Sequence, residues 1–118
     1  MASVTGIQQI REIIMRIAKV IGKVVLSRSH SSFEGANLKL AVPYTLDNLD
    51  GTSDQEEDAV VAWDQLGTHA DALIGLAEGP EAAQPFRPEL KPVDAYVASI
   101  LDSIDLHEAS ITKIRNAK

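Results

Sequence analysis

The feature of this 118-residue sequence that most constrains its fold is a run of apolar residues at alternating spacings of three and four near the N-terminus. The run consists of Ile7, Ile10, Ile14, Ile17, Ile21 and Val24. This alternation is typical of positions a and d of a heptad, which lie along one side of a helix. Thr5 and Gln8 fit a capping box at its start, and Gly22 weakens its end. The pattern predicts an amphipathic helix over about residues 5–22.

Two later stretches show the same period. Ser53 and Glu56 fit a second capping box, which predicts a helix over about residues 54–78 that ends at Gly79–Pro80. A third helix is predicted over about 93–116, from apolar positions that include Val97, Ile100, Ile104, Ile111 and Ile114, with His107 in the same row. The expected fold class is therefore mainly α, with three amphipathic helices in bundle or coiled-coil-like packing.

The segments between the predicted helices have different characters. Leu38, Leu40 and Val42 alternate with other residues up to Pro43, which predicts a strand and a probable β-hairpin over about 24–43, between the first and second helices. Whether 24–30 is strand or helix stays open. Residues 45–53 are predicted to form an acidic linker, and residues 79–92, with four of the five prolines, an extended connector. The length suits a single domain over 1–118.

The charge is distributed unevenly along the chain. The net charge is −6, from 11 basic and 17 acidic residues. Residues 1–30 hold five basic residues and one acidic residue, whereas residues 31–118 hold six and sixteen. Such asymmetry concerns partners rather than fold. The basic helix either covers the acidic remainder of its own chain or pairs head-to-tail with another copy, and a basic patch for nucleic acid or anionic lipid is a third, less favoured interpretation.

Composition excludes several classes of function. The chain has no cysteine, which excludes disulfides, thiolate metal sites and a cysteine nucleophile. Five aromatic residues are too few for a surface that stacks single-stranded nucleic acid, and no apolar run reaches the length of a membrane span. No phosphate-binding or nucleophile motif occurs. We therefore expect no cofactor and no metal, favour no nucleic-acid partner, find no secretory signal, and expect the chain in the cytoplasm or within an assembled particle.

Isoleucine at both heptad positions favours coiled coils of three or more helices. The predicted self-association seam consists of Ile7, Ile10, Ile14, Ile17, Ile21, Val24, Val97, Ile100, Ile104, His107, Ile111 and Ile114. We predict a non-enzymatic structural or adaptor subunit of a larger assembly, for example a virion, tail or injection machine. Its partners would be copies of itself or another protein of that assembly.

Two alternatives remain open. The first is a small acidic regulatory binder, of the immunity or inhibitor type, that covers a basic site on one protein partner. Its contact residues would be Asp47, Asp50, Asp54, Glu56, Glu57 and Asp58. The second is a small enzyme or metal-binding protein that uses His69 or His107 with nearby carboxylates, although no helix presents a recognised pair of metal ligands.

Overall fold

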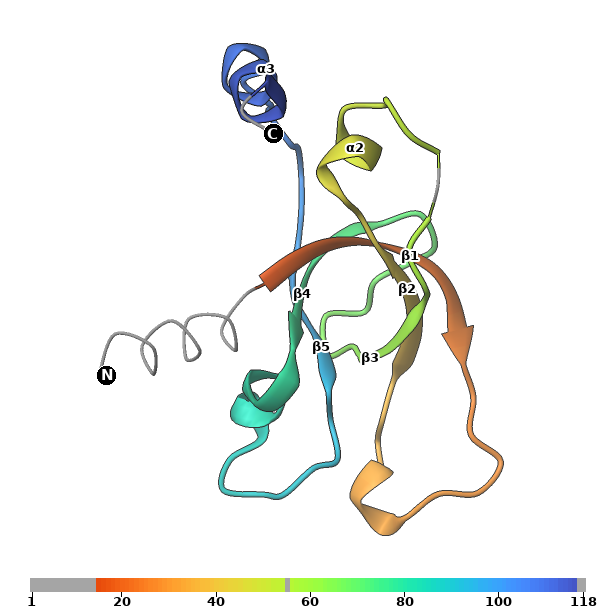
Figure 1. Ribbon diagram of the computed structural model, residues 1–118. Coiled ribbons are helices and arrows are strands. Elements are labelled where there is room, and N and C mark those ends of the chain that lie inside the picture. The colour runs from red at the N-terminus through yellow and green to blue at the C-terminus, as the bar shows by residue number, and fades with distance from the viewer. Residues whose placement is uncertain (1–14, 55, 117–118) are drawn as a thin grey trace, which may run out of the picture.

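The structure is a computed structural model that describes residues 15–54 and 56–116. Five strands close into a barrel in the order β1-β2-β3-β5-β4, with β4 paired to β1 (Figure 1). The strands are β1 (Met15–Val24), β2 (Leu38–Pro43), β3 (Val60–Trp63), β4 (Leu73–Glu78) and β5 (Ala95–Ile100). Neighbouring strands are antiparallel apart from β3 and β5, which pair in parallel at Trp63 and Tyr96. Closure gives each of these five strands a neighbour on both sides.

Short helices occupy the loops between the strands and follow the last one. They are the 3₁₀ helices η1 (Ser31–Phe33) and η2 (Gly79–Phe86), and the α-helices α2 (Leu46–Leu49) and α3 (Glu108–Asn116). Figure 1 shows α2 and α3 at one end of the barrel, which we call the α2 end (residues 44–59 and 101–116). The long β1–β2 and β4–β5 loops extend from the opposite end, which we call the loop end (residues 25–37 and 79–94).

The barrel interior is filled mainly by small side chains. Its core cluster is Ala18, Val20, Ala41, Ala62, Ala72, Ile74, Leu76, Ala95 and Val97, of which five are alanine. A barrel of only five strands has a narrow interior, because its diameter grows with strand number. Alanine at these positions lets the strands close around the few large residues, chiefly Ile74 and Leu76.

The mainly α prediction is wrong, and two β-bulges contribute to the error in the first and third predicted helices. On β1, residues Val20 and Gly22 oppose consecutive residues of β2, so Ile21 is an extra residue. On β5, Val97 and Ser99 oppose consecutive residues of β4, so Ala98 is extra. A bulge shifts the alternation of inward and outward side chains by one residue. Apolar residues then fall three or four apart, as they do on a helix.

The predicted helices are corrected as follows. Residues 15–22 of the predicted helix 5–22 belong to β1, and residues 5–14 lie outside the described residues. The predicted helix 54–78 contains β3, a turn and β4, and Gly67 and Asp71 have positive φ angles that break any helix there. The predicted helix 93–116 is β5 followed by an irregular stretch, and only Glu108–Asn116 is helical.

The predicted connections were partly right. β2 ends at Pro43 as expected and forms an antiparallel hairpin with β1, but the first strand lies at 15–24 rather than after residue 24. The acidic linker 45–53 contains α2, capped reciprocally by Thr45 and Asn48. The expected extended connector 79–92 is instead the 3₁₀ helix η2 over its first eight residues.

Candidate functional site

Four aromatic side chains form a row that joins the barrel to the loop end. The ring centroids of Phe33 and Trp63 are 6.0 Å apart, those of Trp63 and Phe86 are 4.8 Å apart, and those of Phe86 and Tyr96 are 5.6 Å apart. The Tyr96 hydroxyl donates to Gln65 Oε1 at 2.5 Å. Such pairs stabilise by about 0.5–1.5 kcal/mol each beyond area burial. The row fixes η1 and η2 against β3 and β5.

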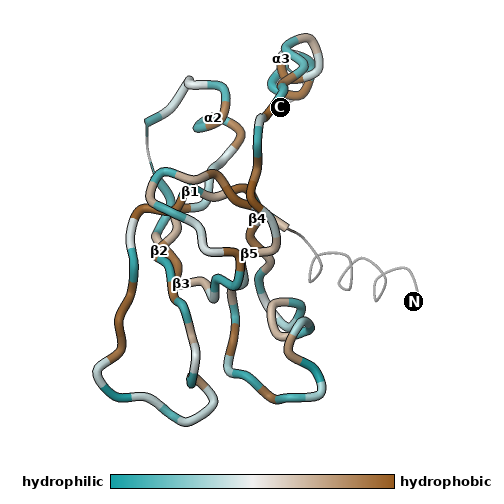
Figure 2. The backbone as a smooth tube through the Cα atoms, turned by 180° about the vertical axis from the view of Figure 1, so that it is seen from behind, coloured by the Kyte–Doolittle hydropathy of each residue, from teal (hydrophilic) through white to brown (hydrophobic). Residues whose placement is uncertain are grey.

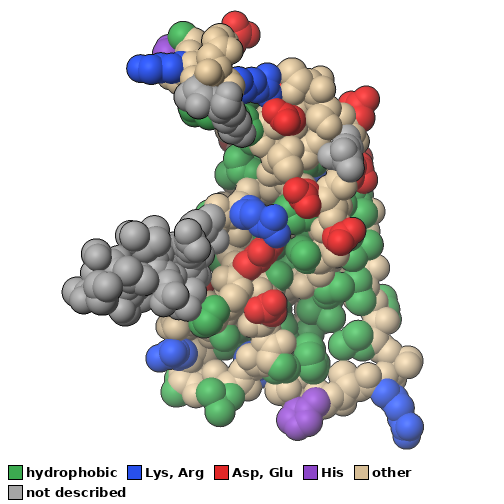
Figure 3. All heavy atoms as spheres, in the orientation of Figure 1, with side chains coloured by type: hydrophobic (Ala, Val, Ile, Leu, Met, Phe, Trp, Pro, Cys, Tyr) green, Lys and Arg blue, Asp and Glu red, His purple; other side chains and the backbone are tan. Residues whose placement is uncertain are grey.

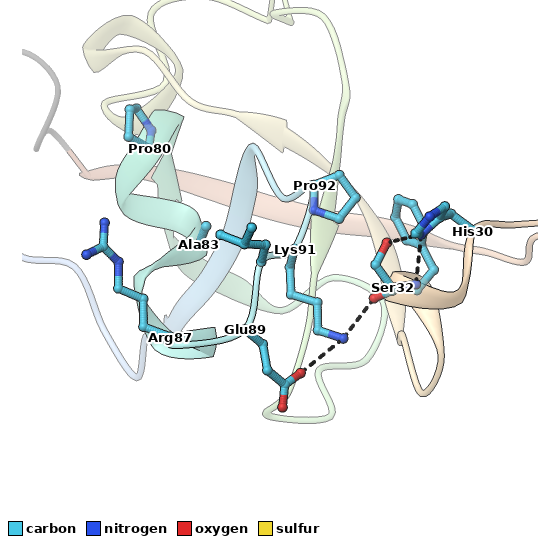
Figure 4. A pocket seen from close by; sticks show the side chains of 10 residues that line it. His30, Ser32, Pro80, Ala83, Arg87, Glu89, Lys91 and Pro92 are labelled. Atoms are coloured by element: carbon cyan, nitrogen blue, oxygen red, sulfur yellow. Dashed lines mark hydrogen bonds and ion pairs between the residues drawn. The ribbon is translucent and has the colours of Figure 1, made fainter.

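Lys91 ties the two long loops to each other. Its Nζ donates to the Ser32 carbonyl at 2.9 Å, lies 3.3 Å from the Glu89 carboxylate, and lies 5.8 Å from the centroid of the Trp63 ring. Figure 4 shows the Lys91 side chain reaching across to Ser32. A largely apolar groove of about 650 Å³, open to solvent, lies between the two loops, with residues of η1 and η2 in its walls. The loop end is therefore a braced surface rather than two independent loops.

A buried carboxylate, Asp64, organises the turn after β3. Asp64 Oδ1 accepts from the backbone N–H groups of Leu66 (2.9 Å) and Gly67 (3.1 Å). Asp64 Oδ2 accepts from the backbone and the hydroxyl of Thr68, both at 2.7 Å, and lies 3.6 Å from Lys39 Nζ. Burial raises the pKa of Asp64, but the hydrogen bonds from Thr68 and Leu66 and the Lys39 charge outweigh it and hold the pKa below its usual range.

At the α2 end, Arg115 of α3 binds the acidic turn around α2. Its Nη2 lies 2.5 Å from Asp47 Oδ1, contacts Asp50 Oδ2, and donates to Thr52 Oγ1 at 3.0 Å. We call these four residues the Arg115 clasp. The hydrogen bond from the Thr52 hydroxyl is the main cause that lowers the pKa of Asp50. Burial opposes it, and the Thr52 backbone N–H and the Arg115 charge add to the lowering.

The predicted seam residues do not form one continuous surface. Ile7, Ile10 and Ile14 lie outside the described residues. Ile17, Ile21 and Val24 are on β1, whereas Val97 and Ile100 are on β5, where Val97 is buried in the barrel. Ile104 and His107 precede α3, and Ile111 and Ile114 are on it. His107 is exposed, with Nδ1 2.6 Å from Ser110 Oγ, so it is not a polar residue within a packed seam.

The predicted acidic contacts divide into two groups. Asp47 and Asp50 belong to the Arg115 clasp. Asp54, Glu56, Glu57 and Asp58 are exposed on the loop that leads into β3. His69 is exposed and bonds the neighbouring Ala70 carbonyl, and within residues 15–54 and 56–116 no group of three metal-ligating side chains comes together.

Periodicity gave no indication of several exposed apolar residues. Val25 and Leu90 at the loop end are 80% and 92% exposed, and Val61 on β3 is 47% exposed. Figure 2 shows that the chain stays hydrophobic as it leaves β1 for the β1–β2 loop. Exposed apolar side chains of this kind mark contact surfaces when they gather in patches. The available signal was the run of apolar residues Val24–Leu26, which continues past the end of the predicted first helix.

A small closed barrel with braced loops and exposed apolar side chains at both ends is a scaffold suited to packing against other protein subunits. The chain belongs to the family described as ethanolamine utilisation protein EutN/carboxysome, whose model matches residues 15–102. α3 lies beyond the matched segment.

Individual relatives agree with this assignment. The carboxysome shell vertex protein CcmL of Synechococcus elongatus is 34% identical over 97 residues, which cover 82% of this chain and 93% of that protein. The structure of CcmL from Gloeobacter violaceus has a TM-score of 0.67 and 29% identity, and the match covers 78% of this chain and 90% of that one. GrpN, a pentameric microcompartment shell protein from Rhodospirillum rubrum, has a TM-score of 0.65 and covers 79% of this chain and 100% of its own. At 24% identity it shows the shared fold.

Family membership confirms the prediction of a non-enzymatic structural subunit whose partners are proteins of an assembled particle. The suggestions of a virion, tail or injection machine, of a helical bundle and of a coiled coil are wrong. The alternative of a small enzyme is wrong for the same reason. Within the described ranges, no helix has the length and apolar character needed to cross a bilayer.

Proposed function

We propose that this chain is a homopentameric vertex subunit of a protein microcompartment shell. The observation that carries the proposal is the 34% identity to a carboxysome shell vertex protein over 97 residues, joined to the same barrel fold in a second CcmL. The pentameric state is stated for a relative of the same fold, GrpN. A pentamer also agrees with the expectation of three or more copies.

The distribution of apolar side chains supports a ring. A cyclic pentamer uses a heterologous interface, in which one surface of each copy meets a different surface of the next. The described chain exposes Val61 and Leu66 on and after β3, and Ile100 and Ile114 on and beyond β5. Figure 3 shows hydrophobic side chains gathered over the flank of the barrel below α2. Two unlike apolar surfaces on one chain are what a closed ring requires.

The braced loop end supports a structural role. Lys91 and the row of aromatic rings hold the β1–β2 and β4–β5 loops in one arrangement. A rigid subunit loses little conformational entropy on assembly, because its loops are already ordered. A small entropy cost favours a protein that must form the same interface repeatedly around a ring.

The vertex role is tested in cells that build the shell. Removing the chain is expected to leave shells open or distorted at their corners, and returning it should restore closed shells, as seen by electron microscopy. The purified chain should give five-fold symmetric rings in negative stain. Normal closed shells without the chain would contradict the vertex role, and particles without five-fold symmetry would contradict the pentamer.

A further inference from the structure

The C-terminal helix α3 packs only loosely against the rest of its own chain. None of its nine residues is buried, and the irregular stretch 101–107 joins it to β5. The Arg115 clasp holds one side of the helix. Ile111, four residues before Arg115 and so on the same side, is half-buried. Ile114, by contrast, is 52% exposed, and Lys113 is exposed without an ion pair to any described residue.

The opposite flank of the same end has complementary properties. The loop leading into β3 exposes Glu56 and Glu57, neither of which pairs with a basic side chain in the described ranges. Val61 follows on β3 and is 47% exposed. Figures 1 and 2, from opposite sides, both show α3 on one side of α2 and this loop on the other.

We propose that α3 of one copy docks on the 56–61 flank of the next copy in the ring, with Ile114 against Val61 and Lys113 beside Glu56 and Glu57. Rotation about a cyclic axis keeps features of one end at one height. With the axis running from the loop end to the α2 end, α3 of each copy therefore comes level with its neighbour's acidic loop. The inference rests on the proposed ring and adds to it a contact beyond the family-matched segment 15–102.

The Arg115 clasp has a defined part in this arrangement. It fixes α3 on its own barrel, so that the side bearing Lys113 and Ile114 faces away from that barrel. A pre-positioned helix binds more tightly than a free one, because its ordering cost is met before association. Arg115 is thus a positioning residue, and Lys113 and Ile114 are the contact residues.

The apolar contact is tested by Ile114→Asp, with Thr112→Asp as a control that adds the same charge at an exposed neighbouring position. Ile114→Asp is expected to raise the concentration at which the oligomer dissociates by about tenfold or more, whereas Thr112→Asp leaves it unchanged. Sedimentation on dilution measures both, and fluorescence of Trp63 reports whether the barrel remains folded. Equal stability of the two variant rings would overturn the proposal.

The pairing is tested by charge exchange at low salt. Lys113→Glu alone and the double variant Glu56→Lys/Glu57→Lys alone should each weaken the oligomer, and the combined chain should recover most of its stability, because every interface then carries the reversed pair. A combined chain as weak as its parents would overturn the proposal while leaving the pentamer intact. A wild-type chain that stays monomeric would instead contradict the proposed function.

Discussion

Among single residues, Asp64 shows how one buried carboxylate can organise the turn that follows a strand. The turn after β3 must reverse the chain toward β4 within a few residues, and Gly67 takes a positive φ to do so. Asp64 accepts hydrogen bonds from three consecutive backbone N–H groups of this turn, and the Thr68 hydroxyl and Lys39 complete its environment. The buried charge is fully partnered, so removing it leaves several donors without an acceptor.

We predict that Asp64→Asn destabilises the barrel at pH 7 by about 1–3 kcal/mol. Because the folded-state pKa of Asp64 is lowered, its stabilising contribution is present above the unfolded value near ~3.9 and is lost as pH falls through the folded value. The gap between wild type and variant should therefore narrow below about pH 4. Urea unfolding, followed by Trp63 fluorescence, measures this difference in free energy of unfolding. Asp102→Asn, at an exposed position, serves as the control. A gap that stays constant from pH 7 to pH 3 would sink this account of Asp64.

At the scale of elements, the barrel and α3 are stabilised by different interactions. The strands bury an apolar core, whereas α3 buries no residue and relies on the Arg115 clasp. Segments with few buried apolar contacts open at low free energy, independently of the core. The α2 turn should open with α3, since Asp47 and Asp50 lose their partner when the clasp is broken.

We predict that Arg115→Gln speeds amide hydrogen exchange in α3 and α2 and leaves β2 and β4 unchanged. The substitution removes the positive charge that holds Asp47 and Asp50, and it leaves the barrel core unchanged. Hydrogen exchange followed by mass spectrometry resolves the segments, and Thr112→Ala serves as a control for substitution in α3. Unchanged exchange in α3, or faster exchange in β4, would show that the clasp does not have this role.

Elements also show how much of the fold the sequence could reveal. The alternation of Leu38, Leu40 and Val42 before Pro43 predicted β2 correctly, because that strand has no bulge of its own. β5 was misassigned because Ala98 is an extra residue that breaks the alternation. β1 was misassigned because its isoleucines continue a spacing of three and four that starts before residue 15, and Ile21 is an extra residue within that run. A bulge depends on the partner strand, so a single sequence does not reveal it.

The same limit applies to the candidate surfaces. Asp47 and Asp50 were predicted to contact another protein, whereas in this chain both pair with Arg115, 68 and 65 positions away. Ile114 remains a candidate for association, whereas Val97 fills the barrel core. Val61 was missed because its exposure follows from its place on the outer surface of a strand, which a helical interpretation hides.

Across the whole molecule, the two ends of the barrel have different properties. The α2 end carries an acidic loop and an outward helix, and the loop end carries braced loops with exposed apolar side chains such as Val25 and Leu90. In a ring with cyclic symmetry every copy points the same way, so these properties add up on opposite faces of the assembly. The two faces of such a ring would therefore present different loops and a different arrangement of charge.

If five copies of this chain close into a ring, native mass spectrometry of the purified chain should reveal that ring. We expect one dominant species of five 12.7 kDa chains, about 64 kDa, that persists on dilution to low micromolar concentration. Higher salt should weaken it only moderately, since apolar contacts contribute beside the charged ones. A dominant monomer, or a ring of any other stoichiometry, would contradict the claim.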